Sequence, residues 1–240
     1  MYESDGLPNR LRRWAVRSTA SRSGTVLAAP SSALAALIEA STGRSCITLP
    51  HGVDRSIFRP GDTDGEDVLC VADFYAHKRQ DLVIAAWQRL PRPRPMLRLV
   101  GDPSVDAGVH ARTSAIVAAL DEPEAVEIAG LVPHRRMGEL YRRASVLVVA
   151  SEHESFCLPV AEAMASGVPV LARDLPSLRE TAGNGGVFVA GDSPADWSRA
   201  LESTLKRSAG SVPDRHTVLE ASARYSWERS AERVLAATTA

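Results

Sequence analysis

The residues whose types and spacing could do chemistry begin with two glutamates, Glu154 and Glu162, which have seven residues between them. A strand-like run ends near residue 150, and Pro159 follows where a helix is expected to begin, a position for which proline is preorganised. The loop at residues 155–158 would then present unpaired backbone N–H groups in front of the positive end of that helix, which suits a diphosphate. Because phosphate repels carboxylates, we expect both glutamates to accept hydrogen bonds from sugar hydroxyls instead.

A parallel sheet is the expected support for this loop. Short apolar runs that are typical of buried strands occur at residues 66–72, 96–100, 125–129, 145–150, 168–172 and 186–189. Helix-length stretches lie between them at residues 78–90, 107–120, 134–144, 158–166 and 175–182. This alternation predicts an α/β fold with a doubly wound parallel sheet, in which ligands bind beyond the carboxyl ends of the strands.

The first fifty residues differ from the rest. Strand-like stretches at residues 24–30 and 45–49 flank a helix that Ser31 or Ser32 would cap. Two strands are too few for an independent sheet, so we expect this segment to be part of a first domain. The basic stretch at residues 10–22 is interpreted as a solvated helix face, with a phosphate- or lipid-facing surface and weak peripheral membrane contact as the alternative.

The glutamate pair and the run EAMASGVPV that starts at Glu162 resemble the signature of the retaining glycosyltransferases of family 4, the glycosyl transferases group 1, which have the GT-B fold. Lys78 matches the phosphate-binding lysine of this family. Further segments that resemble the family lie at residues 51–54 (HGVD), 58–60 (FRP), 99–102 (LVGD), 129–132 (AGLV), 179–181 (RET) and 227–228 (WE). The resemblance, which covers roughly residues 10–235, implies three parts. These are a remnant of an acceptor-side domain at 1–54, a Rossmann-like donor-binding domain at 55–225, and a helix in 226–240 that returns to the first part.

The resemblance also implies a role for each site residue. Lys78 would neutralise the diphosphate leaving group, Glu154 would contact the hydroxyls of the donor sugar, and Glu162 would contact the ribose. The remaining residues around the donor would be Ser155, Phe156, Cys157 and Leu158 at the phosphates and sugar, and Leu131 and Val132 at the base. The donor would be a nucleotide diphosphate sugar, bound as a substrate, and neither a cofactor nor a metal ion is expected.

Two positions depart from the family pattern. Asp73 stands where the family has an arginine, five residues before Lys78. A carboxylate that faces a diphosphate is unfavourable, so we expect Asp73 to point elsewhere and Arg79 to substitute as the second phosphate-binding cation. Cys157 stands where the family often has glycine, and its side chain would narrow the approach to the sugar.

The composition argues against several other classes of protein. The formal net charge of −1 provides no basic stripe for nucleic acid, and no apolar run approaches the ~18 residues of a membrane span. The first residues lack the apolar core of a signal peptide, so a cytoplasmic protein is expected. Three widely spaced cysteines and six unclustered histidines predict neither a disulfide framework nor a metal site. The triplet at residues 62–64 (DTD) is interpreted as a solvated turn.

Two alternatives to a donor-binding transferase half are considered. One is a module that binds a nucleotide sugar without transferring it, which Asp73 and the short first part favour. The other is a sugar-nucleotide epimerase of the same architecture, against which the loop between Glu154 and Glu162 argues. Residues 1–54 supply so little of an acceptor-side domain that we do not expect this chain alone to transfer sugar to an acceptor, whose identity is unknown. We expect it to be a fragment of a longer enzyme, one subunit of a split transferase, or a chain whose self-association covers the exposed sheet edge.

Overall fold

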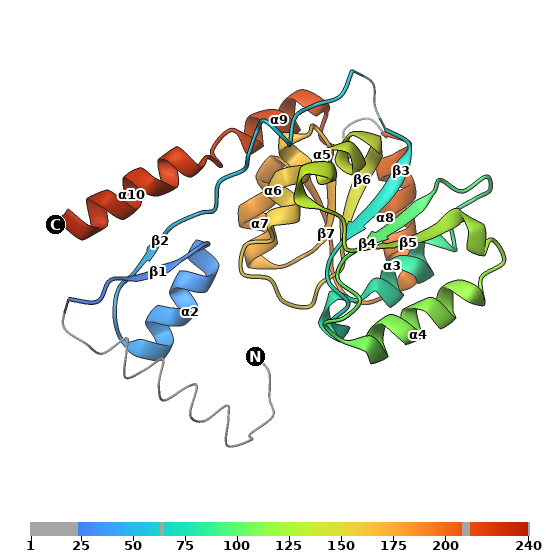
Figure 1. Cartoon of the computed structure of the whole chain (residues 1–240), viewed down its shortest axis with the longest axis horizontal. Helices are drawn as coiled ribbons and strands as arrows, with labels where there is room; N and C mark the ends of the chain where they lie inside the picture. The colour runs from blue at the N-terminus through green and yellow to red at the C-terminus, as the bar shows by residue number, and fades with distance from the viewer. Residues whose placement is uncertain (1–23, 63–64, 208–211, 240) are drawn as a thin grey trace.

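The computed structural model describes residues 24–62, 65–207 and 212–239, so the basic stretch at 10–22 and most of the 62–64 triplet lie outside the described residues. Its centre is a six-stranded sheet in which neighbouring strands are parallel (Figure 1). In spatial order the strands are β5 (Val126–Gly130), β4 (Leu97–Val100), β3 (Asp67–Val71), β6 (Ala144–Val149), β7 (Val170–Arg173) and β8 (Gly186–Val189). The expected α/β class is therefore confirmed.

Helices cover both faces of the sheet. One face packs against α3 (Gln80–Trp87), α4 (Ala107–Ala118) and α8 (Pro194–Leu205), and the other against α5 (His134–Arg143), α6 (Leu158–Ala165), α7 (Pro176–Ala182) and α9 (Arg215–Ser222). Val68 and Cys70 of β3 contribute to the first core and Leu69 to the second, because side chains alternate along a strand. Burial on both faces explains why the strand sequences lack polar alternation. Within the described residues no helix is both long and apolar enough to cross a membrane.

The first part of the chain forms a small unit beside α7. β1 (Leu27–Ala29) and β2 (Cys46–Thr48) pair in parallel, and α2 (Ser32–Thr42) connects them. Glu180 of α7 accepts hydrogen bonds from the Ser32 amide and hydroxyl, each at 2.7 Å. A carboxylate is favourable at a helix N-terminus because the first N–H groups have no partner within the helix. The start of α2 is therefore held on α7.

The last helix, α10 (Trp227–Thr239), extends from the sheet domain toward β2 (Figure 1). Arg233 Nη1 donates a hydrogen bond to the Thr48 carbonyl at 3.2 Å. The segment that leads from β2 to the sheet domain passes very close to the start of α10, since a Cβ added to Gly52 would lie 2.2 Å from the Trp227 nitrogen. Only glycine fits at this crossing.

Candidate functional site

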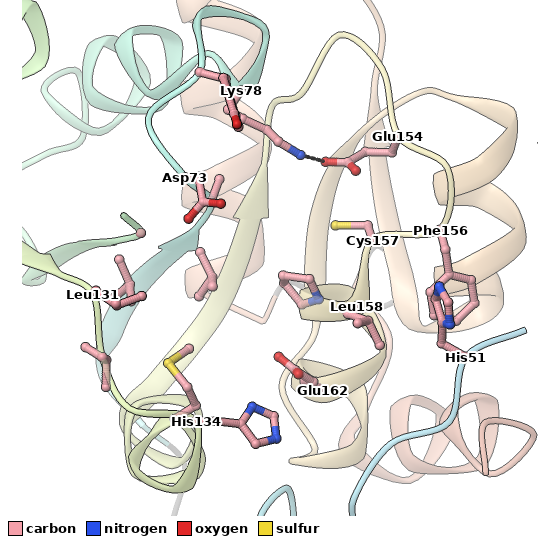
Figure 2. Close-up of a pocket in the computed structure, with 18 of the residues that line it drawn as sticks. His51, Asp73, Lys78, Leu131, His134, Glu154, Phe156, Cys157, Leu158 and Glu162 are labelled. Atoms are coloured by element: carbon pink, nitrogen blue, oxygen red, sulfur yellow. Dashed lines mark hydrogen bonds and ion pairs between the residues drawn. The ribbon is translucent and has the colours of Figure 1, made fainter. Parts of the chain in front are cut away.

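The carboxyl ends of β3 and β6 open into a cleft of about 860 Å³ (Figure 2). These strands are neighbours in space although β4 and β5 lie between them in the sequence. Such a switch point leaves a crevice between the loops that follow the two strands. The predicted site residues that line the cleft are Lys78, Leu131, Val132, Glu154, Ser155, Phe156, Cys157, Leu158 and Glu162.

An ion pair joins the two residues that were expected to be catalytic. Lys78 Nζ lies 2.7 Å from Glu154 Oε1, and the two side chains are only 19% and 10% exposed. Lys78 ends the short 3-10 helix η1 (Ala76–Lys78) after β3, whereas Glu154 follows β6, so the pair spans the cleft (Figure 2). Burial works to lower the pKa of Lys78, but the attraction and hydrogen bond of Glu154 raise it above its ordinary value.

Three successive carbonyls in the loop after β6, those of residues 154–156, accept hydrogen bonds from hydroxyl groups. Ser177 and Thr181 of α7 donate to the first and the third carbonyl, both at 2.7 Å. The hydroxyl of Ser31, which also caps α2, donates to the second. The loop is thus held in place through its carbonyls, from two different helices, without using its N–H groups.

The amide N–H groups of residues 155–158 have no hydrogen-bond partner in the part of the chain that the structure describes. Cys157 has a left-handed backbone with φ 67° and ψ 79°, and α6 begins at the next residue with Pro159 in its first turn. These N–H groups therefore lie at the N-terminus of α6, where an anion is favoured. The left-handed backbone is a conformation that glycine adopts without cost. Burial raises the pKa of the Cys157 thiol well above its ordinary value.

Glu162 lies in the cleft beside His134, away from the ion pair of Lys78 and Glu154 (Figure 2). Tyr141 of α5 donates a hydrogen bond to its Oε2 at 2.8 Å. Burial raises the pKa of Glu162, and the hydrogen bond from Tyr141 and the proximity of His134 oppose that rise. A half-buried carboxylate that is oriented by one donor is suited to accept further hydrogen bonds from hydroxyls.

Arg79 is the exception among the predicted site residues, and its assignment to the donor site is corrected. It has a left-handed backbone with φ 54°, and its side chain lies outside the cleft lining. The guanidinium forms ion pairs with Asp81, Glu152 and Asp192 at 3.1, 3.1 and 3.2 Å. Because three carboxylates already surround this cation, it does not replace the arginine that Asp73 displaces.

Asp73 lines the cleft, contrary to the expectation that it points elsewhere (Figure 2). Its Oδ1 accepts a hydrogen bond from the Asp102 amide at 2.9 Å. This contact ties the turn after β4 to the turn after β3, where Gly101 is so close that a Cβ would lie 2.1 Å from the Ala72 carbonyl oxygen. Asp73 therefore positions the wall of the cleft and leaves its negative charge there.

Three further cleft residues, Tyr75, His77 and His134, were not singled out from the sequence. The rings of Tyr75 and His77 stack with centroids 5.6 Å apart, and His77 and His153 stack at 5.4 Å. His77 directly precedes Lys78, and His134 follows the predicted loop at residues 131–132 by two positions. The sequence signal that could have identified these two histidines is their position next to predicted site residues.

Comparison with known proteins places the chain in a family. Residues 55–224 match the family described as glycosyl transferases group 1, and the chain belongs to that family. It is similar to the D-inositol 3-phosphate glycosyltransferases of Geodermatophilus obscurus, at 33% identity over 223 residues, and of Acidothermus cellulolyticus, at 31% over 207 residues. These matches cover 82% and 78% of this chain but only 48% and 46% of the relatives, so the chain spans about half of their length.

Solved structures show the same fold. Sucrose-phosphate synthase from Thermosynechococcus elongatus superposes with a TM-score of 0.84 at 23% identity, over 98% of this chain and 63% of that one. Anabaena HepE in complex with UDP and glucose superposes with a TM-score of 0.84 at 16% identity, over 96% and 67% of the two chains. The parallel sheet and its helices are therefore an arrangement of the GT-B type.

Proposed function

We propose that this chain is the donor-binding half of a retaining glycosyltransferase of family 4 that uses a nucleotide diphosphate sugar. The observation that carries this proposal is the cleft itself, where Lys78, Glu154 and the unpaired N–H groups of residues 155–158 lie together. Glu162 adds an oriented carboxylate to the same cleft. The named relatives are glycosyltransferases, and one structure of the same fold holds UDP and glucose.

In the proposed reaction, the diphosphate lies between Lys78 and the N-terminus of α6. The ammonium and the N–H groups stabilise the negative charge that develops on the diphosphate as the glycosidic bond breaks. Glu154 exchanges its hydrogen bond with Lys78 for hydroxyls of the donor sugar, and Glu162 accepts hydrogen bonds from the ribose. Leu131 and Val132 lie against the base. No metal ion is needed for these contacts.

We further propose how the chain divides and where it works. Residues 55–225 bind the donor, residues 1–54 are a remnant of the acceptor-side domain, and residues 226–240 return to that remnant. Transfer then requires acceptor groups from a longer form of this chain, from a partner chain or from a second copy. The proposed location is the cytoplasm, where nucleotide sugars are available to the cleft.

A thermal-shift panel of UDP-, GDP-, ADP- and dTDP-sugars tests the proposed function. A ligand at about a hundred times its dissociation constant stabilises the folded state by ~2.7 kcal/mol, which raises Tm by about 5–11 °C in a chain of this length. Lys78→Ala should remove most of that shift. Lys206→Ala, which changes an exposed lysine outside the cleft lining, is the matched control. If no sugar nucleotide raises Tm in wild type, the proposed function is wrong.

A nucleotide-sugar-binding module without transferase activity is the second candidate, and Asp73 favours it. This carboxylate lies in the cleft where a second cation would assist departure of the diphosphate. An assay for release of the nucleoside diphosphate from the nucleotide sugar separates the two candidates. A chain that binds the donor tightly but neither hydrolyses it nor transfers the sugar, even with the supplied partner domain of a relative, is a binding module.

A further inference from the structure

The cleft contains few cations for a ligand as negative as a diphosphate. Among its described lining residues, Lys78 is the only lysine or arginine, whereas Asp73, Glu154 and Glu162 are carboxylates. Lys78 is in addition already paired with Glu154 at 2.7 Å. The terminal phosphate of a nucleoside diphosphate, the leaving group of the proposed donor, alone carries about −1.5 to −2 charges at pH 7. A further source of positive charge near Lys78 would therefore strengthen diphosphate binding considerably.

His77 is placed to supply that charge. It lines the cleft directly before Lys78, and its backbone carbonyl accepts a hydrogen bond from the Glu152 amide at 2.8 Å. Its ring stacks on Tyr75 at an interplanar angle of 23° and on His153 at 18°. The two rings that stack on it limit the orientations of the imidazole, and the residue belongs to the lining of the cleft.

The groups around His77 hold opposing charges. Burial lowers the pKa of His77 most strongly, and the positive charges of Lys78 and His153 lower it further. The carboxylates of Glu154 and Glu152 act in the opposite direction, and Tyr75 contributes only its ring. The net shift favours a neutral imidazole at pH 7. An anion that enters beside the ring reverses this balance, since a nearby negative charge favours the protonated form.

We propose that His77 is a second phosphate-binding side chain, which takes up a proton when the diphosphate of a donor enters the cleft. The proton comes from solvent, no covalent bond changes, and the imidazolium then donates a hydrogen bond to a phosphate oxygen beside Lys78. In this way the chain obtains a second cation that Asp73 and Arg79 do not provide. This inference rests on the proposed function, because it requires that a nucleoside diphosphate binds here.

Calorimetry with UDP, GDP, ADP and dTDP tests the inference. Titrations in buffers of different ionisation enthalpy count the protons taken up on binding, and we expect uptake in wild type that is absent in His77→Gln. A rise of one unit in the pKa of His77 corresponds to a tenfold change in affinity. The ratio of wild-type to His77→Gln affinity should therefore grow about tenfold between pH 8 and pH 5.5. Because the nucleotide titrates in the same way with both proteins, its own protonation cancels in this ratio of affinities.

Two further variants make the test specific. His77→Lys carries a permanent charge, so it should bind the diphosphate more tightly than wild type at pH 8 and show no proton uptake. His110→Gln changes a histidine of α4 that packs edge-to-face against Phe74 outside the cleft lining, and it should retain the wild-type proton uptake. Equal affinity of wild type and His77→Gln for the bare nucleoside would show that the cleft is intact.

The outcomes separate this inference from the function on which it rests. If no nucleoside diphosphate binds to wild type at any pH, the proposed function fails. If one binds while proton uptake persists in His77→Gln, the function stands and the role of His77 is overturned. Loss of uptake in His153→Gln with uptake retained in His77→Gln would assign the proton to the neighbouring ring and would likewise overturn it.

Discussion

Replacing Glu154 with Gln separates the structural role of the ion pair from its role in binding. The Lys78 and Glu154 side chains are 19% and 10% exposed, and their charged atoms are 2.7 Å apart. At an effective dielectric constant of 20, two unit charges 4 Å apart attract by about 4 kcal/mol, but loss of hydration offsets much of this. Gln keeps an acceptor oxygen for Nζ, so we expect a loss of about 1–3 kcal/mol and a Tm lower by about 2–12 °C.

The same substitution should strengthen binding of a nucleoside diphosphate. In wild type the diphosphate competes with Glu154 for Lys78, whereas in Glu154→Gln the ammonium has no charged partner in the pair. If the diphosphate then gains about 1.4 kcal/mol of binding free energy from Lys78, its affinity for the variant rises tenfold. The sugar conjugate should gain less, because the variant loses a charged acceptor for the sugar hydroxyls, which costs ~1–3 kcal/mol. Selectivity for the sugar conjugate over the bare diphosphate should therefore fall.

Calorimetry with the diphosphate and its sugar conjugate, for the nucleotide that the thermal-shift panel selects, measures both effects. Glu202→Gln is the matched control, because Glu202 also pairs with a lysine, Lys206 at 2.6 Å, but lies outside the cleft lining. This control should leave both affinities within about twofold of wild type. A Glu154→Gln variant that binds the diphosphate more weakly than wild type does would refute the competition between carboxylate and phosphate for Lys78.

Three other substitutions have defined outcomes. Glu162→Gln should raise Tm at pH 7 by removing a buried charge but weaken nucleoside binding. Since burial raises the folded-state pKa of Glu162 above 4.5, wild-type stability should fall as pH increases through that raised pKa, and melts from pH 4 to 8 should show a smaller fall in the variant. Thr181→Val removes the hydroxyl that holds the Phe156 carbonyl and should cost about 1–3 kcal/mol in urea unfolding, with weaker diphosphate binding. Gly52→Ala should displace the start of α10 at Trp227, and limited proteolysis should then cleave there while the sheet domain melts as in wild type.

The sheet was predictable because its strands are buried on both faces. In β6, Val146, Leu147 and Val148 are all nearly inaccessible, and a run of apolar, mostly β-branched residues between turns is typical of a strand in the middle of a parallel sheet. The cleft followed from the same reasoning, since the loops after parallel strands meet at one edge. Lys78 and Glu154 could thus be placed near each other, although 76 positions separate them.

Other features required the three-dimensional structure. The left-handed backbone of Arg79 separates η1 from α3, so the helix that was expected at 78–90 begins at Gln80, and an arginine at that position does not predict such a backbone. The orientation of its side chain depends on Asp192, which is 113 positions away. By contrast, α8 was missed although the signal was present, because Ser193 caps it and Trp197 and Leu201 recur at helical spacing.

The hydroxyl of Ser31 on the carbonyl of Ser155 has a consequence for protein engineering. Ser31 lies before the residues that match the family, yet it holds a loop inside them. A chimera that joins residues 55–240 to the first part of another protein of this family would therefore have a loop after β6 that lacks one of its three carbonyl contacts. The contact would be kept only if the incoming part also begins the corresponding helix with Ser or Thr. A crossover point that keeps all three carbonyl contacts lies upstream of Ser31, within or before β1, and not at residue 55.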